Sequence, residues 1–280
     1  MTGRASARDR VRAYTGRGAK METMRIENSV ALVTGAGRGL GRVFVEELAR
    51  RGAKTIYAAA RNPAQISDQA GPGIPVELDI TQPDQVAAAA ERCADVNLLI
   101  NNAGVMTSSP FLEAQTMDGA RQEIETNYLG TLAMCRAFAP VLAANGGGAL
   151  VNLLSVTSFF ANPENGSYGA SKSAEWSMTN GARIELARQG TLIVGVHAGF
   201  IDTDMATEIA RGLPKLDPLD VVRQVFDAVE AGQVEVLAGE RTQRIKSQLP
   251  EDHEKIYPAV QARWDAEHPG PGRSGSPAAT

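Results

Sequence analysis

The chain has 280 residues, of which 43% are apolar, and it carries a formal net charge of −4 at a sequence pI of about 5.5. This apolar content is enough for a sizeable core, and the acidic balance argues against a nucleic-acid-binding or membrane-surface protein. No apolar run reaches the roughly 18 residues that a transmembrane helix needs, so we expect a soluble, cytoplasmic protein.

The first 25 residues form a basic arm, which contains seven Arg or Lys residues against Asp9 and Glu22. A nucleic-acid tail, an organellar presequence and a start codon assigned too early all remain open, because Met21 and Met24 stand just before the regular pattern begins. We predict a disordered arm over 1–25, one folded domain over 26–268 and a disordered Gly/Pro/Ser-rich tail over 269–280.

Seven short β-branched runs then alternate with longer Ala/Leu-rich segments as far as Glu240. The predicted strands are 29–34, 54–60, 75–80, 96–101, 148–155, 191–197 and 234–239. The predicted helices are 39–51, 83–93, 118–143, 168–189 and 217–231, and the prolines and glycines of 61–74 leave room there only for a short helix. Several strands are apolar at consecutive positions, which is typical of strands buried on both faces. The pattern predicts a single α/β domain of the Rossmann type, with a doubly wound, seven-stranded, mainly parallel sheet.

The glycine-rich stretch "TGAGRGLG" (34–41) follows the first predicted strand and opens the first predicted helix. Gly35, Gly39 and Gly41 permit a tight turn and a close backbone approach to a pyrophosphate, which the free N–H groups of the helix N-terminus would face. A glycine turn alone is as often an ordinary turn, but this one lies between a strand and a helix, as a phosphate-binding turn requires.

A tyrosine and a lysine, Tyr168 and Lys172, lie one helical turn apart in "SYGASKSAEW" (167–176). An ammonium beside a phenol lowers the tyrosine pKa and makes it a usable proton donor and acceptor. We expect Lys172 to have no carboxylate partner. For this pair alone, two solvated polar residues on a surface helix are the competing interpretation.

Taken together, these stretches resemble the short-chain dehydrogenase/reductase family from about Asn28 to Gly239. The resemblance rests on "TGAGRGLG", on "NNAG" (101–104), on Asn127 in "NYLG", and on Ser155 thirteen residues before "YGASK" (168–172). It implies that Tyr168 is the general acid/base and that Lys172 is its electrostatic partner and a ligand of the nicotinamide ribose. It also implies that Ser155 binds the substrate oxygen, while Asn127 holds a helix bend and a relay water.

The same resemblance implies which residues line the cofactor site. These are Gly35, Arg38, Gly39, Leu40, Gly41, Arg61, Asp79, Ile80, Asn102, Ala103, Gly104, Tyr168, Lys172, Gly199, Ile201 and Thr203. Asp79 would meet the adenine amino group, although a strand-terminating turn is an equally good interpretation of this residue. Ala198 stands where the family usually has proline, so we expect a looser turn before the nicotinamide loop.

The second predicted strand indicates the cofactor. Ala60 occupies the strand end where NAD enzymes of this fold commonly carry an acid, Arg61 follows it, and Arg38 lies inside the glycine turn. Two guanidiniums converging there would suit a 2′-phosphate, so we expect NADP(H); two solvated surface arginines are the alternative.

We therefore expect an NADP(H)-dependent oxidoreductase, a carbonyl reductase or alcohol dehydrogenase. A catalytically silent NADP-binding regulatory protein and a nucleotide-sugar epimerase or dehydratase are the alternatives. The expected substrate wall comprises Met106, Phe159, Phe160, Asn162 and Met205, with 205–215 as a lid. This lining has no basic residue before Arg211, so we expect a neutral, fairly hydrophobic ketone, aldehyde or secondary alcohol. The helices 118–143 and 168–189 resemble those that pair in family dimers and tetramers, so we expect a homodimer or homotetramer.

The remaining reactive side chains give no second site. Cys93 and Cys135 are isolated and are expected to be buried free thiols. The three histidines lack metal-ligand spacing, and we expect His197 to be a satisfied strand-end residue and no metal to be bound.

Overall fold

The computed structural model describes residues 24–67, 73–204 and 213–268. Seven strands of this part form one sheet in the order β3-β2-β1-β4-β5-β6-β7, and each neighbouring pair is parallel. The strands are β1 (Val30–Thr34), β2 (Thr55–Ala60), β3 (Ile74–Glu77), β4 (Leu98–Asn101), β5 (Ala149–Leu153), β6 (Leu192–Ala198) and β7 (Glu235–Ala238). The doubly wound Rossmann-type sheet is thus confirmed, with all of its strands parallel.

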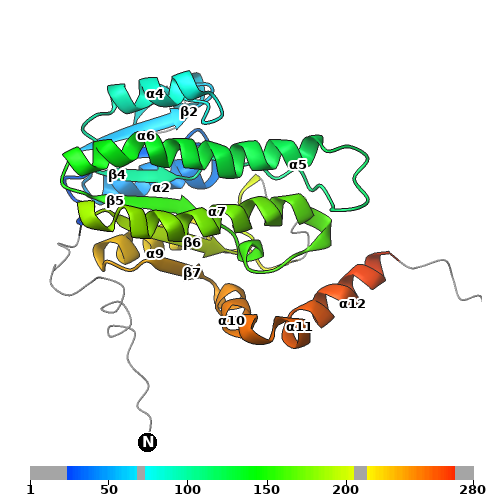
Figure 1. Ribbon diagram of the computed structural model, residues 1–280. Helices are drawn as coiled ribbons and strands as arrows, with labels where there is room; N and C mark the ends of the chain where they lie inside the picture. Colours follow the sequence, from blue (N-terminus) through cyan, green and yellow to red (C-terminus); the bar gives the residue numbers. More distant parts are fainter. Residues whose placement is uncertain (1–23, 68–72, 205–212, 269–280) are drawn as a thin grey trace, which may run out of the picture.

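Helices cover both faces of the sheet (Figure 1). One face carries α2 (Gly39–Arg50) and α9 (Pro218–Glu230), which contact each other. The other face carries α4 (Pro83–Arg92), α6 (Thr131–Ala144) and α7 (Gly166–Glu185). In the described part of the connection after β2, the helix is the four-residue α3 (Ala64–Ser67), in agreement with the short helix predicted there.

The strands are buried on both sides because successive side chains point to opposite faces. In β1, Val30 and Leu32 belong to the hydrophobic cluster under α4 and α6, whereas Ala31 and Val33 belong to the cluster under α2 and α9. Full burial of a valine or leucine side chain stabilises the fold by about 1.5–3 kcal/mol. The consecutive apolar positions in the sequence are therefore the signature of two cores separated by one sheet.

The predicted helix 118–143 is interrupted in the structure. It consists of α5 (Asp118–Glu123), a π-helical segment η1 (Ile124–Gly130) and α6. The buried amide of Asn127 accepts a hydrogen bond from the Val105 N–H at 2.8 Å and donates to the Val105 carbonyl at 2.9 Å. The side chain of Asn127 thus bonds to another segment of the chain at the place where the helix widens into a π-helical turn. Such π-helical segments are frequent at functional sites.

Three helices that sequence reasoning did not anticipate follow β7. They are α10 (Glu240–Gln248), α11 (Asp252–Lys255) and α12 (Tyr257–Glu267), which extend from the edge of the sheet (Figure 1). In α12 no residue is buried, so the chain there carries no apolar stripe that would have revealed a helix. Ile256 is buried beside Phe159 and Phe160 and attaches this segment to the domain. Within the described ranges, no helix has the length and apolar character needed to cross a bilayer.

Candidate active site

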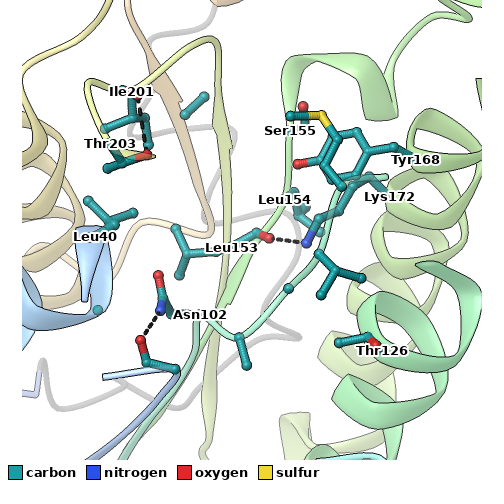
Figure 2. Close-up of a pocket in the computed structure, with 18 of the residues that line it drawn as sticks. Leu40, Asn102, Thr126, Leu153, Leu154, Ser155, Tyr168, Lys172, Ile201 and Thr203 are labelled. Carbon is teal, nitrogen blue, oxygen red and sulfur yellow. Dashed lines mark hydrogen bonds between the residues drawn. The ribbon is translucent and has the colours of Figure 1, made fainter. Parts of the chain in front are cut away.

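A cavity of about 510 Å³ opens along the carboxyl ends of the central strands (Figure 2). Its walls include residues that follow β1, β4, β5 and β6, among them Gly35, Asn102, Ser155 and Gly199. Tyr168 and Lys172 of α7 line the same cavity. Ligands bind in this position in open parallel α/β sheets, because the loops of neighbouring strands diverge there.

The glycine turn shapes one end of this cavity. Gly35 and Gly39 have backbone φ angles of +66° and +52°, which residues other than glycine rarely adopt. A Cβ on Gly41 would lie 2.2 Å from the Gly35 carbonyl oxygen, so the turn can close only around glycine. The N-terminus of α2 is directed to this turn, and its backbone N–H groups suit an anion such as a pyrophosphate.

Asn102 connects the turn to β4. Its side-chain amide donates to the Thr34 carbonyl at 2.9 Å, and its backbone N–H donates to the Thr34 hydroxyl at 3.0 Å. These bonds cross from one strand end to the next, so they hold the glycine turn at a fixed distance from the centre of the cavity.

Ser155 lies two residues beyond β5 and has two structural relationships. Its hydroxyl caps a short 3-10 turn (Val156–Ser158) by accepting the Thr157 N–H at 3.2 Å, and it also lines the cavity beside Tyr168 (Figure 2). Its carbonyl accepts a hydrogen bond from the Ser158 hydroxyl. This cap fixes the Ser155 hydroxyl in place.

His197 lies behind this loop near the end of β6, and its expected satisfied state is confirmed only in part: it is buried, but its Nε2 has no hydrogen-bond partner among the described residues and lies 3.5 Å from Glu235 Oε1. Its Nδ1 is 2.8 Å from the Ser158 hydroxyl and 3.2 Å from the Ser155 carbonyl, and its ring stacks on Phe159. Burial lowers the His197 pKa, although Glu235 opposes this, so the neutral ring is favoured. The residue supports the Ser155 loop and does not line the cavity.

The expected lowering of the Tyr168 pKa is wrong. Burial of the phenol raises its pKa, and this outweighs the lowering by the Lys172 ammonium and the Ser155 hydroxyl; Glu175 and Glu123 raise it further. Tyr168 is therefore protonated at neutral pH, so its phenol can donate a proton.

The expectation that Lys172 has no carboxylate is also wrong. Its Nζ lies 2.7 Å from Glu175 Oε2 and donates to the Leu153 carbonyl at 2.7 Å (Figure 2). Both partners of the ion pair are buried. The signal was present in the sequence, because residues three apart are neighbours on a helix, and Glu175 follows Lys172 at that spacing.

Asn127 does not line the cavity. Besides its bonds to Val105, its amide donates to the Ser171 hydroxyl at 2.9 Å, which in turn donates to the Tyr168 carbonyl at 2.7 Å. The residue thus connects the π-helical segment to the first turns of α7, one layer behind the residues that face the cavity.

The cavity brings together all the residues expected to bind the cofactor. The list comprises Gly35, Arg38, Gly39, Leu40, Gly41, Arg61, Asp79, Ile80, Asn102, Ala103, Gly104, Tyr168, Lys172, Gly199, Ile201 and Thr203. Asp79 forms a turn as well, because one carboxylate oxygen accepts the Thr81 N–H at 3.0 Å and the Thr81 hydroxyl at 2.8 Å.

Arg38 and Arg61 are both exposed at this end of the cavity. Neither forms an ion pair with a carboxylate in the described part of the chain, and Ala60, the last residue of β2, is buried. Two arginines lie beside the glycine turn, and no acidic residue stands at the end of β2. This arrangement fits a nucleotide that carries a 2′-phosphate.

The expected substrate wall is partly wrong. Met106 and Asn162 line the cavity, but Phe159 and Phe160 are buried in a cluster with Val156 and Ile256 and do not. The C-terminal helices, which sequence reasoning missed, provide the buried partner that draws these two rings inward. Met205 and most of the proposed lid lie outside the described residues.

Two basic side chains that were not anticipated line the cavity. Arg241 of α10 lies over the Phe200 ring at 5.7 Å, and Arg263 of α12 pairs with Glu164 and with Glu267. Arg241 has no ion pair with a carboxylate among the described residues. The sequence contained no motif that would place either arginine at the cavity, because both follow β7, beyond the last predicted strand.

Comparisons with known proteins agree with this geometry. A family model described as short chain dehydrogenase matches residues 29–213. The 3-oxoacyl-[acyl-carrier-protein] reductase FabG of Escherichia coli is 32% identical over 194 residues, which cover 67% of this chain and 79% of the reductase. An uncharacterized oxidoreductase of Staphylococcus saprophyticus is 28% identical over 217 residues, covering 73% of this chain and 92% of its own length.

Two solved structures are similar to most of this chain. A short chain dehydrogenase from Burkholderia cenocepacia in complex with NADP has a TM-score of 0.80 and 44% identity, covering 85% of this chain and 99% of its own. A short chain dehydrogenase/reductase from Burkholderia phymatum in complex with NAD has a TM-score of 0.72 and 25% identity, covering 84% and 96%. Relatives of this chain therefore bind one or the other nicotinamide cofactor.

Proposed function

The chain belongs to the short-chain dehydrogenase/reductase family, and on this premise we propose that it is an NADP(H)-dependent carbonyl reductase or alcohol dehydrogenase. The observation that carries the proposal is that Ser155, Tyr168 and Lys172 line one cavity with a glycine turn suited to a pyrophosphate. A protein that only binds the cofactor would need the glycine turn, but it would not need Ser155, Tyr168 and Lys172 together in the same cavity.

The residues divide the chemical work. The bound nicotinamide would supply or accept a hydride. Ser155 donates a hydrogen bond to the carbonyl oxygen of the substrate, since its hydroxyl is fixed by Thr157 at the end of β5. Tyr168 gives its proton to that oxygen as negative charge develops, and Lys172 stabilises the resulting phenolate by its charge. In the oxidative direction Tyr168 takes the proton back.

The proposed cofactor is NADP(H) rather than NAD(H). Support comes from the two cavity-lining arginines Arg38 and Arg61, from Ala60 in place of an acid, and from the NADP complex of the 44% identical Burkholderia cenocepacia protein. The second solved relative is an NAD complex, so the relatives alone do not select the cofactor.

The proposed substrate is a ketone, aldehyde or secondary alcohol whose reacting end is neutral and fairly hydrophobic. Val105, Met106 and Val156 provide apolar wall near Ser155 and Tyr168. Arg241 and Arg263 line the same cavity, so the far end of the substrate can be polar or acidic. We further propose a homodimer or homotetramer, in which the exposed Leu129 and Ile184 of the η1 and α7 surface would be covered.

The test is turnover of a panel of ketones, aldehydes and quinones, followed by NADPH absorbance, with the Tyr168→Phe variant as the blank. We expect NADPH consumption that stops in the variant. Tight NADPH binding without turnover of any member would favour a silent regulatory protein. Conversion of a nucleotide sugar without net NADPH consumption would favour an epimerase.

A further inference from the structure

The Glu175 carboxylate lies behind the proposed active site and has no assigned role. It is buried on the same face of α7 as Tyr168 and Lys172. One oxygen, Oε2, contacts Lys172 Nζ at 2.7 Å, and the other, Oε1, is buried without a hydrogen-bond partner in the part of the chain described. Burying a carboxylate with an unsatisfied oxygen costs folding free energy, so the charged form needs a compensating contact. Lys172 is the cation that provides this contact.

Lys172 in turn depends on Glu175. An ammonium has three donors, and here two of them are taken by the Leu153 carbonyl and by Glu175. The Leu153 carbonyl is neutral, so Glu175 is the anion that compensates the buried charge. The Lys172 side chain is largely excluded from water, and a buried lysine without a counter-charge readily loses its proton.

We propose that Glu175 is a positioning residue for the reaction, which keeps Lys172 an ammonium and holds it at the end of β5 behind Tyr168. The inference rests on the proposed function, because it assigns Glu175 a role in tuning the acid/base pair of that site. Glu175 does not line the cavity, so it acts through Lys172 and not on the substrate.

The pH at which this role matters follows from the surroundings. Burial raises the Glu175 pKa to about 7, although Lys172 opposes it, while Glu175 and Tyr168 raise the Lys172 pKa against the effect of burial. The other titratable group beside the carboxylate is Cys135 of α6, whose pKa is raised to about 12 by burial, so it stays neutral. Glu123 of α5 acts on Tyr168 and has no contact with Lys172.

We therefore expect the effect of Glu175→Gln on kcat/KM to depend on pH. Near pH 6 the wild-type carboxyl is largely protonated and glutamine imitates it, so we expect kcat/KM for carbonyl reduction within about threefold of wild type. Toward about pH 9 the variant's Lys172 loses its charge, and kcat/KM should fall at least about tenfold further than in wild type. A merely structural role would give a loss of equal size at every pH, and that result would overturn the proposal.

Glu123→Gln is the matched control. It also removes a buried carboxylate that raises the Tyr168 pKa, but its partners are the Thr107 N–H and hydroxyl and the Ser167 hydroxyl. Its effect should lack the additional alkaline loss. An equal alkaline loss in Glu123→Gln would mean that the effect does not pass through Lys172, which contradicts the proposal. Glu175→Asp, which retains the charge, should restore part of the alkaline activity.

A second readout needs neither cofactor nor turnover. In Glu175→Gln, the lysine pKa in the folded protein lies below its unfolded value near ~10.4, so the destabilisation is fully present below the folded pKa and is relieved as pH rises toward ~10.4. Urea unfolding should show the deficit relative to wild type shrinking between about pH 8 and pH 9.5. In Lys172→Met/Glu175→Gln this pH dependence should vanish. A deficit in Glu175→Gln that does not change with pH would overturn the proposal, whether or not the wild-type protein reduces a carbonyl. If the deficit shrinks with pH as expected but the wild-type protein reduces no carbonyl, the proposed function alone has failed.

Discussion

Gly41 and Gly35 are packed so closely that a Cβ on Gly41 would lie 2.2 Å from the Gly35 carbonyl oxygen and 2.7 Å from the Asn102 amide nitrogen. Backbone atoms cannot move aside as a flexible side chain can, so this contact determines the residue at position 41. The contact joins the start of α2 to the end of β1 and shapes the end of the cavity at which we propose that the cofactor pyrophosphate binds.

Gly41→Ala should therefore destabilise the fold by about 3 kcal/mol and abolish cofactor binding, since overpacking against backbone opens the turn. The matched control is Gly181→Ala within α7, where an added Cβ meets nothing within 4 Å. That variant should stabilise by about 0.5–1 kcal/mol through helix propensity. Urea unfolding and cofactor titration measure both. Similar stability of the two variants would contradict the packing argument.

Tyr168→Phe keeps the ring and removes the transferable proton, so turnover should fall to background while NADPH affinity stays within a few-fold. Lys172→Ala should reduce both turnover and affinity, and it should also destabilise the protein, because Glu175 would lose its buried partner and take up a proton. Single-turnover kinetics and cofactor titration separate these effects. Substantial turnover in Tyr168→Phe would mean that another group provides the proton.

The cofactor preference should depend on Arg38 and Arg61. Charge-assisted hydrogen bonds to a 2′-phosphate contribute about 1.5–3 kcal/mol each before screening, so we expect NADPH to be preferred over NADH by about ten- to a thousandfold. Replacing both arginines by glutamine should remove most of this preference, and Ala60→Asp should shift it toward NADH. The measurement is kcat/KM for both cofactors at two salt concentrations. Equal efficiencies in the unmodified protein would show that the arginines are ordinary surface residues.

Arg241 should discriminate between substrates by charge. For a pair of ketones that differ only in a distal carboxylate or its methyl ester, Arg241→Gln should lower kcat/KM for the acid by about tenfold or more and leave the ester nearly unchanged. Arg244 on the same helix does not line the cavity, so Arg244→Gln is the control. An equal loss on both substrates would argue for a structural role of Arg241.

Acid should destabilise the protein in part through Glu47. Its buried carboxylate accepts hydrogen bonds from Arg50 and Arg51, and these hold its pKa at about 2 despite burial. A lowered pKa contributes stability above the unfolded value near 4.5 that is lost as pH falls toward 2. Glu47→Gln should therefore cost about 2–3 kcal/mol at neutral pH and much less near pH 2. Exposed Glu46, which pairs with Arg42 at 3.5 Å, is the control, and Glu46→Gln should cost less than about 1 kcal/mol at either pH.

The carboxyl-end cavity was predictable because its principal residues lie in local patterns. A glycine turn between a strand and a helix, and a tyrosine and lysine one helical turn apart, place their functional groups by the periodicity of the elements themselves. The structure brings both to one cavity, as the parallel sheet required. The interruption at Asn127 was expected as a helix bend, but its π-helical form follows from bonds to Val105, which lies 22 residues away in sequence.

By itself, the sequence determined the strand–helix alternation, the all-apolar strands and the order of the motifs, because these depend on residues within about one turn or one strand of each other. Only the tertiary structure decided the charge state around Tyr168 and Lys172, since burial and the Glu175 carboxylate, not spacing alone, set those pKa values. It also decided the substrate side of the cavity. Phe159 and Phe160 turn into a core completed by Ile256, while Arg241 and Arg263 reach the cavity from helices that follow the last strand. Contacts between segments so distant in the chain leave no local sequence pattern, because the residues that meet become neighbours only when the chain folds.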